Sequence, residues 1–218
     1  MKKILYLSCM IFFVLNACNS SSSADNSKDS NIVDDTRSPK ELFESAEAKS
    51  KAGDHKGAIA EYDKSIQKDT TNLAAIWNRG NSKTCTGDYQ GAIIDYNRVI
   101  VRHPKDGNAY LCRGICRKLT NDFSGAIADF DKAVQLNSNG SNVYQLRGYC
   151  KMKTGNQAEA LADVNKAIEL DPNMADAYLT RGKLKLQSCS SKEACNDFKK
   201  ASGFGKKEAD DLIKKNCK

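Results

Sequence analysis

The amino-acid sequence predicts an all-α protein in which about five helix-turn-helix units stack into an α-solenoid, with a capping helix at the C-terminus. The first observation that predicts this fold is a 34-residue period in small, aromatic and arginine residues. The second is that turn-forming pairs such as Gly-Asp and Asn-Asp recur in the middle of the units. The third is that the chain has only 3 prolines among 218 residues, so few positions interrupt a helix. A charged fraction of 28% and a mean hydropathy of −0.59 exclude a polytopic membrane protein.

Residues 1–17 have the pattern of a secretory signal peptide. A basic pair at residues 2–3 precedes a mostly apolar run over residues 4–15, which is too short to span a membrane permanently. Cys18 directly follows a small residue at the end of this segment, and the arrangement resembles a bacterial lipoprotein signal. The resemblance implies that Cys18 carries a diacylglycerol and that the lipid is the chain's only contact with the membrane. The alternative is an ordinary signal peptide followed by an incidental cysteine.

Residues 18–38 are expected to form a disordered tether behind the lipid. Serine, asparagine and aspartate dominate this segment, so it has almost nothing to bury. Asn19 stands where lipoproteins retained in the inner membrane of enterobacteria-like cells carry aspartate. The resemblance therefore implies a lipid-anchored protein of the bacterial cell envelope, in the outer membrane rather than the inner one.

Arginine-glycine pairs mark the internal period most clearly. They recur at a constant spacing of 34, at Arg79-Gly80, Arg113-Gly114, Arg147-Gly148 and Arg181-Gly182. This register divides residues 39–208 into the units 39–72, 73–106, 107–140, 141–174 and 175–208. Residues 209–218 are the predicted capping helix, which an array of repeats needs to cover the apolar side of its last unit.

Each unit is predicted to contain two helices. In the third unit the helical periodicity covers residues 108–119 and 123–136, on either side of an Asn-Asp turn. Gly114 on the first helix lets the two backbones approach, and Tyr110 and Phe130 fill the remaining space. This order of aromatic, glycine, alanine, aromatic and proline positions resembles the tetratricopeptide repeat.

The resemblance implies a right-handed superhelix whose concave face is lined by the first helix of each unit. That face is expected to be a groove that binds a peptide or a helix of a protein partner. The repeat register assigns these residues to it: Trp77, Asn81, Thr84, Leu111, Ile115, Lys118, Gln145, Tyr149, Met152 and Lys153. The alternative is that helix rotation buries the large apolar members between repeats, where they are only core.

The repeated arginines have aspartate partners at a constant offset. Sixteen residues separate the members of each pair: Arg79 and Asp95, Arg113 and Asp129, Arg147 and Asp163, Arg181 and Asp197. We interpret them as structural ion pairs between helices, within one repeat or with its neighbour. The functional alternative is a ladder of arginines that binds an anionic ligand.

The cysteines do not have the spacing of a metal or haem site. CxxC and CxxCH motifs are absent and the chain has only 2 histidines, so we expect no metal and no cofactor. Cys195 and Cys217 are candidates for a disulfide that fastens the C-terminal helix, although Cys189 competes for either partner. Cys112, Cys116 and Cys150 are the residues that a thiol-active or metal-handling protein would use.

The sequence therefore predicts a non-catalytic scaffold lipoprotein that binds a protein partner in envelope assembly or secretion. No sequence motif of nucleotide binding, zinc proteolysis or serine hydrolysis is present. The net charge of +7 is moderate and both signs are interspersed, which does not favour a nucleic-acid partner. An alternative function is a receptor for a small solute or a cell-wall fragment, which would use the arginine ladder and Tyr149.

Overall fold

The computed structural model describes residues 35–217. The predicted signal peptide, Cys18 and nearly all of the predicted tether lie outside these residues. All regular secondary structure of the described residues is helical, which confirms the all-α prediction. None of the helices between residues 35 and 217 has both the length and the apolar character that crossing a membrane requires.

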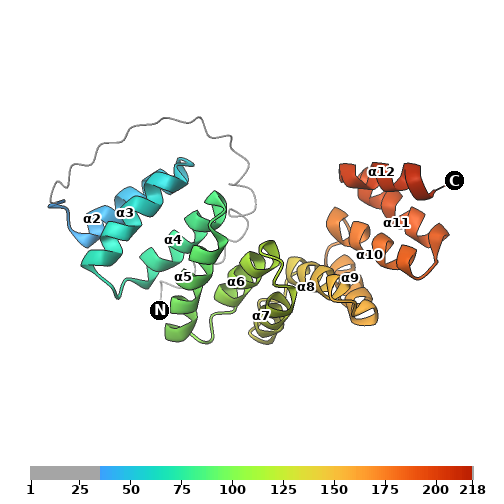
Figure 1. Ribbon diagram of the computed structural model, residues 1–218, viewed down its shortest axis with the longest axis horizontal. Coiled ribbons are helices and arrows are strands. Elements are labelled where there is room, and N and C mark those ends of the chain that lie inside the picture. Colours follow the sequence, from blue (N-terminus) through green and yellow to red (C-terminus); the bar gives the residue numbers. More distant parts are fainter. Residues whose placement is uncertain (1–34, 218) are drawn as a thin grey trace. The chain divides into compact units, whose positions relative to one another are not determined.

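The described helices follow one another with short turns and pair in chain order (Figure 1). Their bounds are α2 Pro39–Lys51, α3 His55–Lys68, α4 Leu73–Thr86, α5 Tyr89–Arg102, α6 Gly107–Leu119, α7 Phe123–Gln135, α8 Ser141–Lys153, α9 Gln157–Leu170, α10 Ala175–Gln187, α11 Ser191–Gly203 and α12 Lys207–Asn216. The helices predicted over 108–119 and 123–136 correspond to α6 and α7, with ends that differ by one residue.

The chain divides into two compact units between Arg102 and His103. In the first unit α2 packs on α3, α3 on α4, and α4 on α5. In the second unit each helix from α6 to α12 packs on the next. The second unit also brings first helices of successive repeats into contact, since α6 touches α8 and α8 touches α10. These are the stacked helix-turn-helix repeats that the period predicts.

The turn inside each repeat contains one residue in the left-handed region. The φ angles there are 85° at Gly53, 85° at Gly87, 63° at Asn121, 86° at Gly155 and 61° at Cys189, and these positions are 34 residues apart. Glycine adopts this conformation without a steric penalty and asparagine tolerates it, whereas cysteine is strained there. The turn geometry is therefore as periodic as the sequence, and the fifth repeat keeps it with an unfavourable residue.

In the third and fifth repeats the two helices approach each other where a glycine of the first helix meets a phenylalanine sixteen positions later on the second. A Cβ atom added to Gly114 would lie 2.7 Å from Phe130, and one added to Gly182 would lie 2.5 Å from Phe198. Both phenylalanines are completely buried. Because no side chain fits at these positions, glycine sets the separation of α6 from α7 and of α10 from α11.

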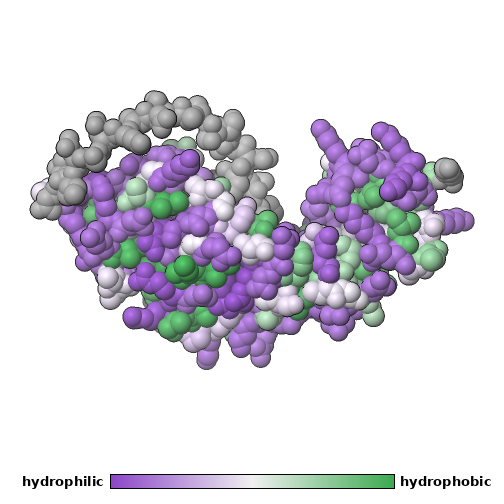
Figure 2. Space-filling view, in the orientation of Figure 1, coloured by the Kyte–Doolittle hydropathy of each residue, from purple (hydrophilic) through white to green (hydrophobic). Residues whose placement is uncertain are grey.

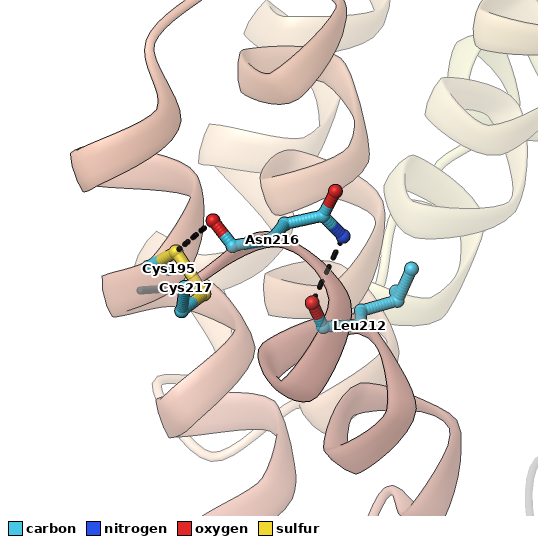
Figure 3. The surroundings of a disulfide bond; sticks show 4 residues. All are labelled: Cys195, Leu212, Asn216 and Cys217. Atoms are coloured by element: carbon cyan, nitrogen blue, oxygen red, sulfur yellow. Dashed lines mark hydrogen bonds between the residues drawn. A yellow bond between two sulfur atoms is a disulfide. The ribbon is translucent and has the colours of Figure 1, made fainter.

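The last helix closes the apolar side of the fifth repeat. Ala209 of α12 is buried, and Leu212 and Ile213 pack against the core formed by α10 and α11. Cys217, directly after α12, forms a disulfide with Cys195 of α11 (Figure 3). The bond joins positions 22 residues apart and restrains a chain end that would otherwise fray.

Figure 2 shows that the visible face of both units is mostly hydrophilic, with hydrophobic residues scattered among the hydrophilic ones. The large apolar side chains that are most exposed in the described residues include two on α5, Ile94 at 61% and Val101 at 77%. Single exposed apolar residues are normal on a protein surface, so exposure alone does not identify a site.

Candidate functional site

Each repeated arginine holds the aspartate sixteen residues later, across the two helices of its repeat. The Nε atoms donate to Oδ2 at 2.9 Å in Arg79–Asp95, 3.0 Å in Arg113–Asp129, 2.8 Å in Arg147–Asp163 and 2.9 Å in Arg181–Asp197. In all four pairs Nη2 donates to the other carboxylate oxygen, so the pairing is bidentate. All four aspartates are buried.

A second cation completes each pair, and our sequence reasoning missed it. These cations lie four residues after the arginines, with contacts to the aspartates of 3.0 Å for Lys83, 2.9 Å for Arg117, 3.0 Å for Lys151 and 3.0 Å for Lys185. Their own 34-residue spacing was the signal that could have revealed them. Each buried carboxylate is thus compensated by two positive charges from the first helix of its repeat.

The arginines also connect neighbouring repeats. Arg79 Nη1 donates to Asp63 of the preceding repeat at 2.7 Å, and Arg147 Nη1 donates to Asp131 at 2.7 Å. Arg181 Nη1 donates to the amide oxygen of the corresponding residue, Asn165, at 2.9 Å. The guanidinium groups therefore serve helix pairing and repeat stacking together.

Three arginines also lie over a tyrosine one helical turn earlier. The guanidinium carbon lies 5.4 Å from the ring centroid of Tyr110 for Arg113, 5.4 Å from Tyr144 for Arg147, and 5.3 Å from Tyr178 for Arg181. The hydrogen bond to Asp197, strengthened by the charge of that carboxylate, raises the pKa of Arg181 against the effect of burial. Each guanidinium therefore has a carboxylate and a tyrosine ring as partners, which leaves it little capacity for an anionic ligand.

The first repeat forms the same contact with different residues. Ser45 replaces the arginine, and Glu61 replaces the aspartate. Arg37, which precedes α2, lies 2.8 Å from Glu61, and Lys49 lies 3.2 Å from it. A cation from outside the repeat register therefore replaces the missing arginine.

In the first unit the predicted groove residues surround Tyr96 of α5. The Tyr96 hydroxyl donates to Asn81 Oδ1 at 2.8 Å and lies 3.3 Å from Thr84 Oγ1. The Trp77 ring meets Tyr96 edge to face, with centroids 5.5 Å apart. Tyr96 is buried, whereas Trp77, Asn81 and Thr84 are half-buried. Trp77 therefore packs against the core on one side and retains an accessible surface on the other.

In the second unit Tyr149 is the centre of a cluster of aromatic and basic residues. Lys118 Nζ of α6 lies 5.7 Å from the Tyr149 ring centroid, and Lys153 Nζ of α8 lies 5.6 Å from it. Phe123 at the start of α7 packs against the same ring edge to face, at 6.3 Å. Tyr149 and Lys118 are half-buried and Lys153 is exposed.

The remaining predicted groove residues differ in exposure. Ile115, Gln145 and Met152 are half-buried, and Met152 packs against the core of α9 and α10. Leu111 is a correction to the prediction, because it is only 4% exposed. It belongs to the hydrophobic core and cannot contribute to a partner-binding surface.

The cysteines of the central repeats are interior residues. Cys112, Cys116 and Cys150 are buried, and burial raises the pKa of Cys150 to about 12, although the nearby Lys118 charge opposes this. A thiol in that environment carries very little of the nucleophilic thiolate form. Within residues 35–217 no group of three or more His, Cys, Asp and Glu residues is arranged to hold a metal ion.

Comparison with known proteins agrees with this architecture. Residues 141–174 match the family model described as tetratricopeptide repeat. No curated protein matches the sequence. The match covers one helix pair, α8 and α9, and the other helix pairs of residues 35–217 stack in the same helix-turn-helix manner.

Several solved structures share the fold. A crystal structure of MamA is 25% identical, covers 76% of this chain and 96% of its own, and has a TM-score of 0.68. MamA from Desulfovibrio magneticus RS-1 is 17% identical, with coverages of 76% and 94% and a TM-score of 0.72. YrrB, described as a TPR protein with an unusual peptide-binding site, is 22% identical, with coverages of 79% and 90% and a TM-score of 0.68.

Proposed function

We propose that the chain is a non-catalytic scaffold that binds a peptide or helical segment of another protein on the first helices of its repeats. The observation that carries this proposal is that one set of side chains is fully engaged in contacts within the chain, whereas another set is partly accessible. The repeated arginines are bound to buried aspartates, whereas Trp77 and Tyr149 keep part of their rings accessible. Half-buried aromatic side chains held by core contacts are typical anchor residues of protein interfaces.

The packing of the second unit supports a binding surface that is larger than one residue. The first helix α8 contacts both α6 and α10, and we infer that the accessible residues of these three helices form one strip. Ile115, Tyr149 and Met152 supply apolar area on this strip, and Lys118 and Lys153 supply charge. A strip with this mixture suits an amphipathic helix or an extended segment better than a compact solute. The peptide-binding site in the description of YrrB is consistent with this use of the fold.

The alternative function, a receptor for a small solute or cell-wall fragment, depends on free arginines. Arg79, Arg147 and Arg181 each donate to a buried aspartate and to an oxygen of the preceding repeat. Binding of an anionic solute would have to break these contacts and remove one of the two cations that compensate each buried carboxylate, which is unfavourable. The ladder is better explained as part of the fold.

We also propose that the scaffold acts in the bacterial cell envelope, anchored by a lipid on Cys18 in the outer membrane rather than the inner one. The signal-like residues 1–17 and the polar segment that follows support this location. A lipid anchor would confine the scaffold to a surface and raise its effective concentration toward partners there. Mass spectrometry of the mature protein tests the anchor, because an N-terminus at Cys18 with acyl chains supports it and an unmodified Cys18 contradicts it.

Photo-crosslinking in living cells tests the binding surface. A photoreactive amino acid is placed at Trp77 and, in a second variant, at Tyr149, and crosslinked proteins are identified by mass spectrometry. Gln67 of α3 and Lys199 of α11, which are exposed on second helices, are the matched control positions. The proposal predicts one or a few defined partners from 77 and 149 that the controls do not capture. Equal capture from all four positions, or capture from the controls alone, would contradict it.

A further inference from the structure

We propose that Lys118, Tyr149 and Lys153 form a binding site for an aspartate or glutamate side chain within an acidic segment of a protein partner. This inference rests on the proposed function and gives it a chemical preference. It places a carboxylate between two ammonium groups that share one aromatic ring.

The packing of α6 against α8 brings two positively charged side chains close to the ring of Tyr149. The Lys118 and Lys153 ammonium groups come from different helices, α6 and α8, yet both lie within 5.7 Å of the Tyr149 ring centroid. Phe123 packs against this ring and restrains it. The tyrosine ring attracts both cations, but it does not neutralise them. A carboxylate from a partner would neutralise charge that the chain leaves uncompensated here.

Lys118 lacks the partner that comparable cations of the second unit have. Lys151 and Lys185 lie 3.0 Å from Asp163 and Asp197, and Lys183 and Lys206 pair with Glu208 and Asp176. Lys118 is also half-buried, but it makes no ion pair or hydrogen bond with any other residue in the range 35–217. A partly desolvated ammonium group with no anion in direct contact is unfavourable, and an incoming carboxylate would remove that cost.

The electrostatic surroundings of Lys118 favour an anion at its ammonium group. Burial lowers the pKa of Lys118, and the neighbouring charge of Lys206 acts in the same direction. Cys150 and Asp176 act against the shift without cancelling it. A carboxylate at the ammonium group would reverse this shift, because an adjacent negative charge favours the protonated amine.

The cluster does not follow the repeat, which argues against a purely structural role. The positions that correspond to Lys118 are Ser50, Thr84, Met152 and Leu186, and those that correspond to Lys153 are Lys51, Cys85, Leu119 and Gln187, so no other pair of successive repeats has lysine at both positions. The contacts that the fold requires in every repeat recur every 34 residues, as the arginine-aspartate pairs do. A pair of lysines that occurs once is not required by repeat packing.

The surroundings favour a peptide over a free anion. Ile115 lies one helical turn before Lys118, and Met152 lies one turn after Tyr149, so apolar side chains flank the charges. An acidic residue next to apolar residues in a partner segment would match this surface. Lysine recognises a carboxylate as a point charge, so the site has no requirement for bidentate geometry.

Peptide selection tests the inference. A phage-displayed library of random 12-residue peptides is panned on the immobilised full-length chain, and the selected peptides are synthesised together with versions in which Asp and Glu are replaced by Asn and Gln. Affinities are measured by fluorescence polarisation for the native chain, for Lys118→Gln and for Lys192→Gln. Lys192 is the matched control, because it is an exposed lysine of α11 in the same unit.

The expected result is enrichment of Asp and Glu and about a tenfold loss of affinity in Lys118→Gln, the size of one charged hydrogen bond. Lys192→Gln should bind like the native chain. The loss from Lys118→Gln and the loss from one neutralised peptide carboxylate should not add, because both remove the same contact. An unchanged circular dichroism spectrum and urea midpoint for Lys118→Gln would show that the variant is folded.

The outcomes separate this inference from the proposed function. If peptides bind but carry no acidic preference, or if Lys118→Gln binds them as the native chain does, the carboxylate site is wrong and the scaffold proposal stands. If binding is acidic but Lys192→Gln weakens it as much as Lys118→Gln, the attraction is general and the site is again wrong. If no peptide binds at all, both proposals fail.

Discussion

The carboxylate of Asp163 is held by Arg147 through two parallel hydrogen bonds, of which the Nε bond to Oδ2 measures 2.8 Å. Lys151, one helical turn further along α8, approaches the same Oδ2 atom at 3.0 Å. The side chains of Asp163, Arg147 and Lys151 are only 8%, 14% and 10% exposed. Two cations of α8 therefore share one buried anion of α9, and the same arrangement recurs in the repeats on either side.

Replacing Asp163 with asparagine should destabilise the second unit strongly. The substitution keeps the size of the side chain but removes the buried anion that Arg147 and Lys151 share, which leaves them only the exposed carboxylates of Asp131 and Glu159. We expect a loss of about 3 kcal/mol in the free energy of unfolding, measured by urea denaturation. Asp131→Asn is the matched control, because the Asp131 side chain is 55% exposed and its pair with Arg147 should contribute less than about 1 kcal/mol. Equal losses in the two variants would contradict this account.

Replacing Gly182 with alanine should force α10 away from α11. The new Cβ atom would lie 2.5 Å from a ring carbon of Phe198 and 3.2 Å from the backbone oxygen of Ala194. Overpacking of this kind costs about 1–3 kcal/mol, which a shift of the thermal unfolding midpoint would reveal. Gly203→Ala, near the end of α11, is the control, since its Cβ would enter open space and alanine favours the helix. A stable Gly182→Ala variant would show that the helix pair adjusts freely.

Replacing Cys189 with glycine should stabilise the fifth repeat. Cys189 has a φ of 61°, at a turn position where three other repeats have glycine. Relief of this strain should raise the free energy of unfolding by up to about 1 kcal/mol. Ser188→Gly tests whether backbone strain is the cause. Ser188 has a φ of −95°, so its replacement with glycine relieves no strain. A stabilisation of the same size at both positions would exclude strain at Cys189 as the cause.

His55 should make the first unit sensitive to acid. Both ring nitrogens are buried and have no hydrogen-bond partner among residues 35–217, and burial lowers the pKa of this histidine despite the nearby charge of Asp54. The unfolded state therefore binds a proton first as the pH falls below about 6.5, so the free energy of unfolding decreases from there downward.

Urea denaturation of His55→Gln between pH 5 and 8 checks this prediction. The variant should lose part of the pH dependence of the native chain. His103→Gln is the control, because it makes the same substitution at an exposed histidine. A profile for His55→Gln that is parallel to the native one would assign the acid sensitivity to other groups.

The periodic part of this structure could be predicted from the sequence, because each periodic contact is determined by helix geometry that recurs. Arg147 and Asp163 have the same offset as three other pairs, so one explanation covers all four. Gly114 and Phe130 could be placed for the same reason. The basic residues at the second cation position, Lys83, Arg117, Lys151 and Lys185, were missed although they obey the same period, because basic residues of a helix are usually solvated.

The part of the surface that does not repeat could not be predicted in the same way. Tyr149 meets Lys118 because α6 and α8 pack side by side with a particular rotation, which sequence spacing does not define. The same rotation buries Leu111, which the repeat register had assigned to the groove. Arg37 takes the role of the missing arginine of the first repeat from a position outside the register, so no periodic argument could locate it.

Hydroxyl-radical footprinting of the chain with and without a captured partner tests the central claim most directly. Trp, Tyr and Met side chains report their own accessibility in this measurement, and Trp77, Tyr149 and Met152 all lie on first helices. The account predicts that these three are oxidised in the free chain and protected in the complex, while Phe204, which is 44% exposed beyond α11, reacts equally in both. Protection of Phe204 with unchanged oxidation of Trp77 and Tyr149 would contradict it.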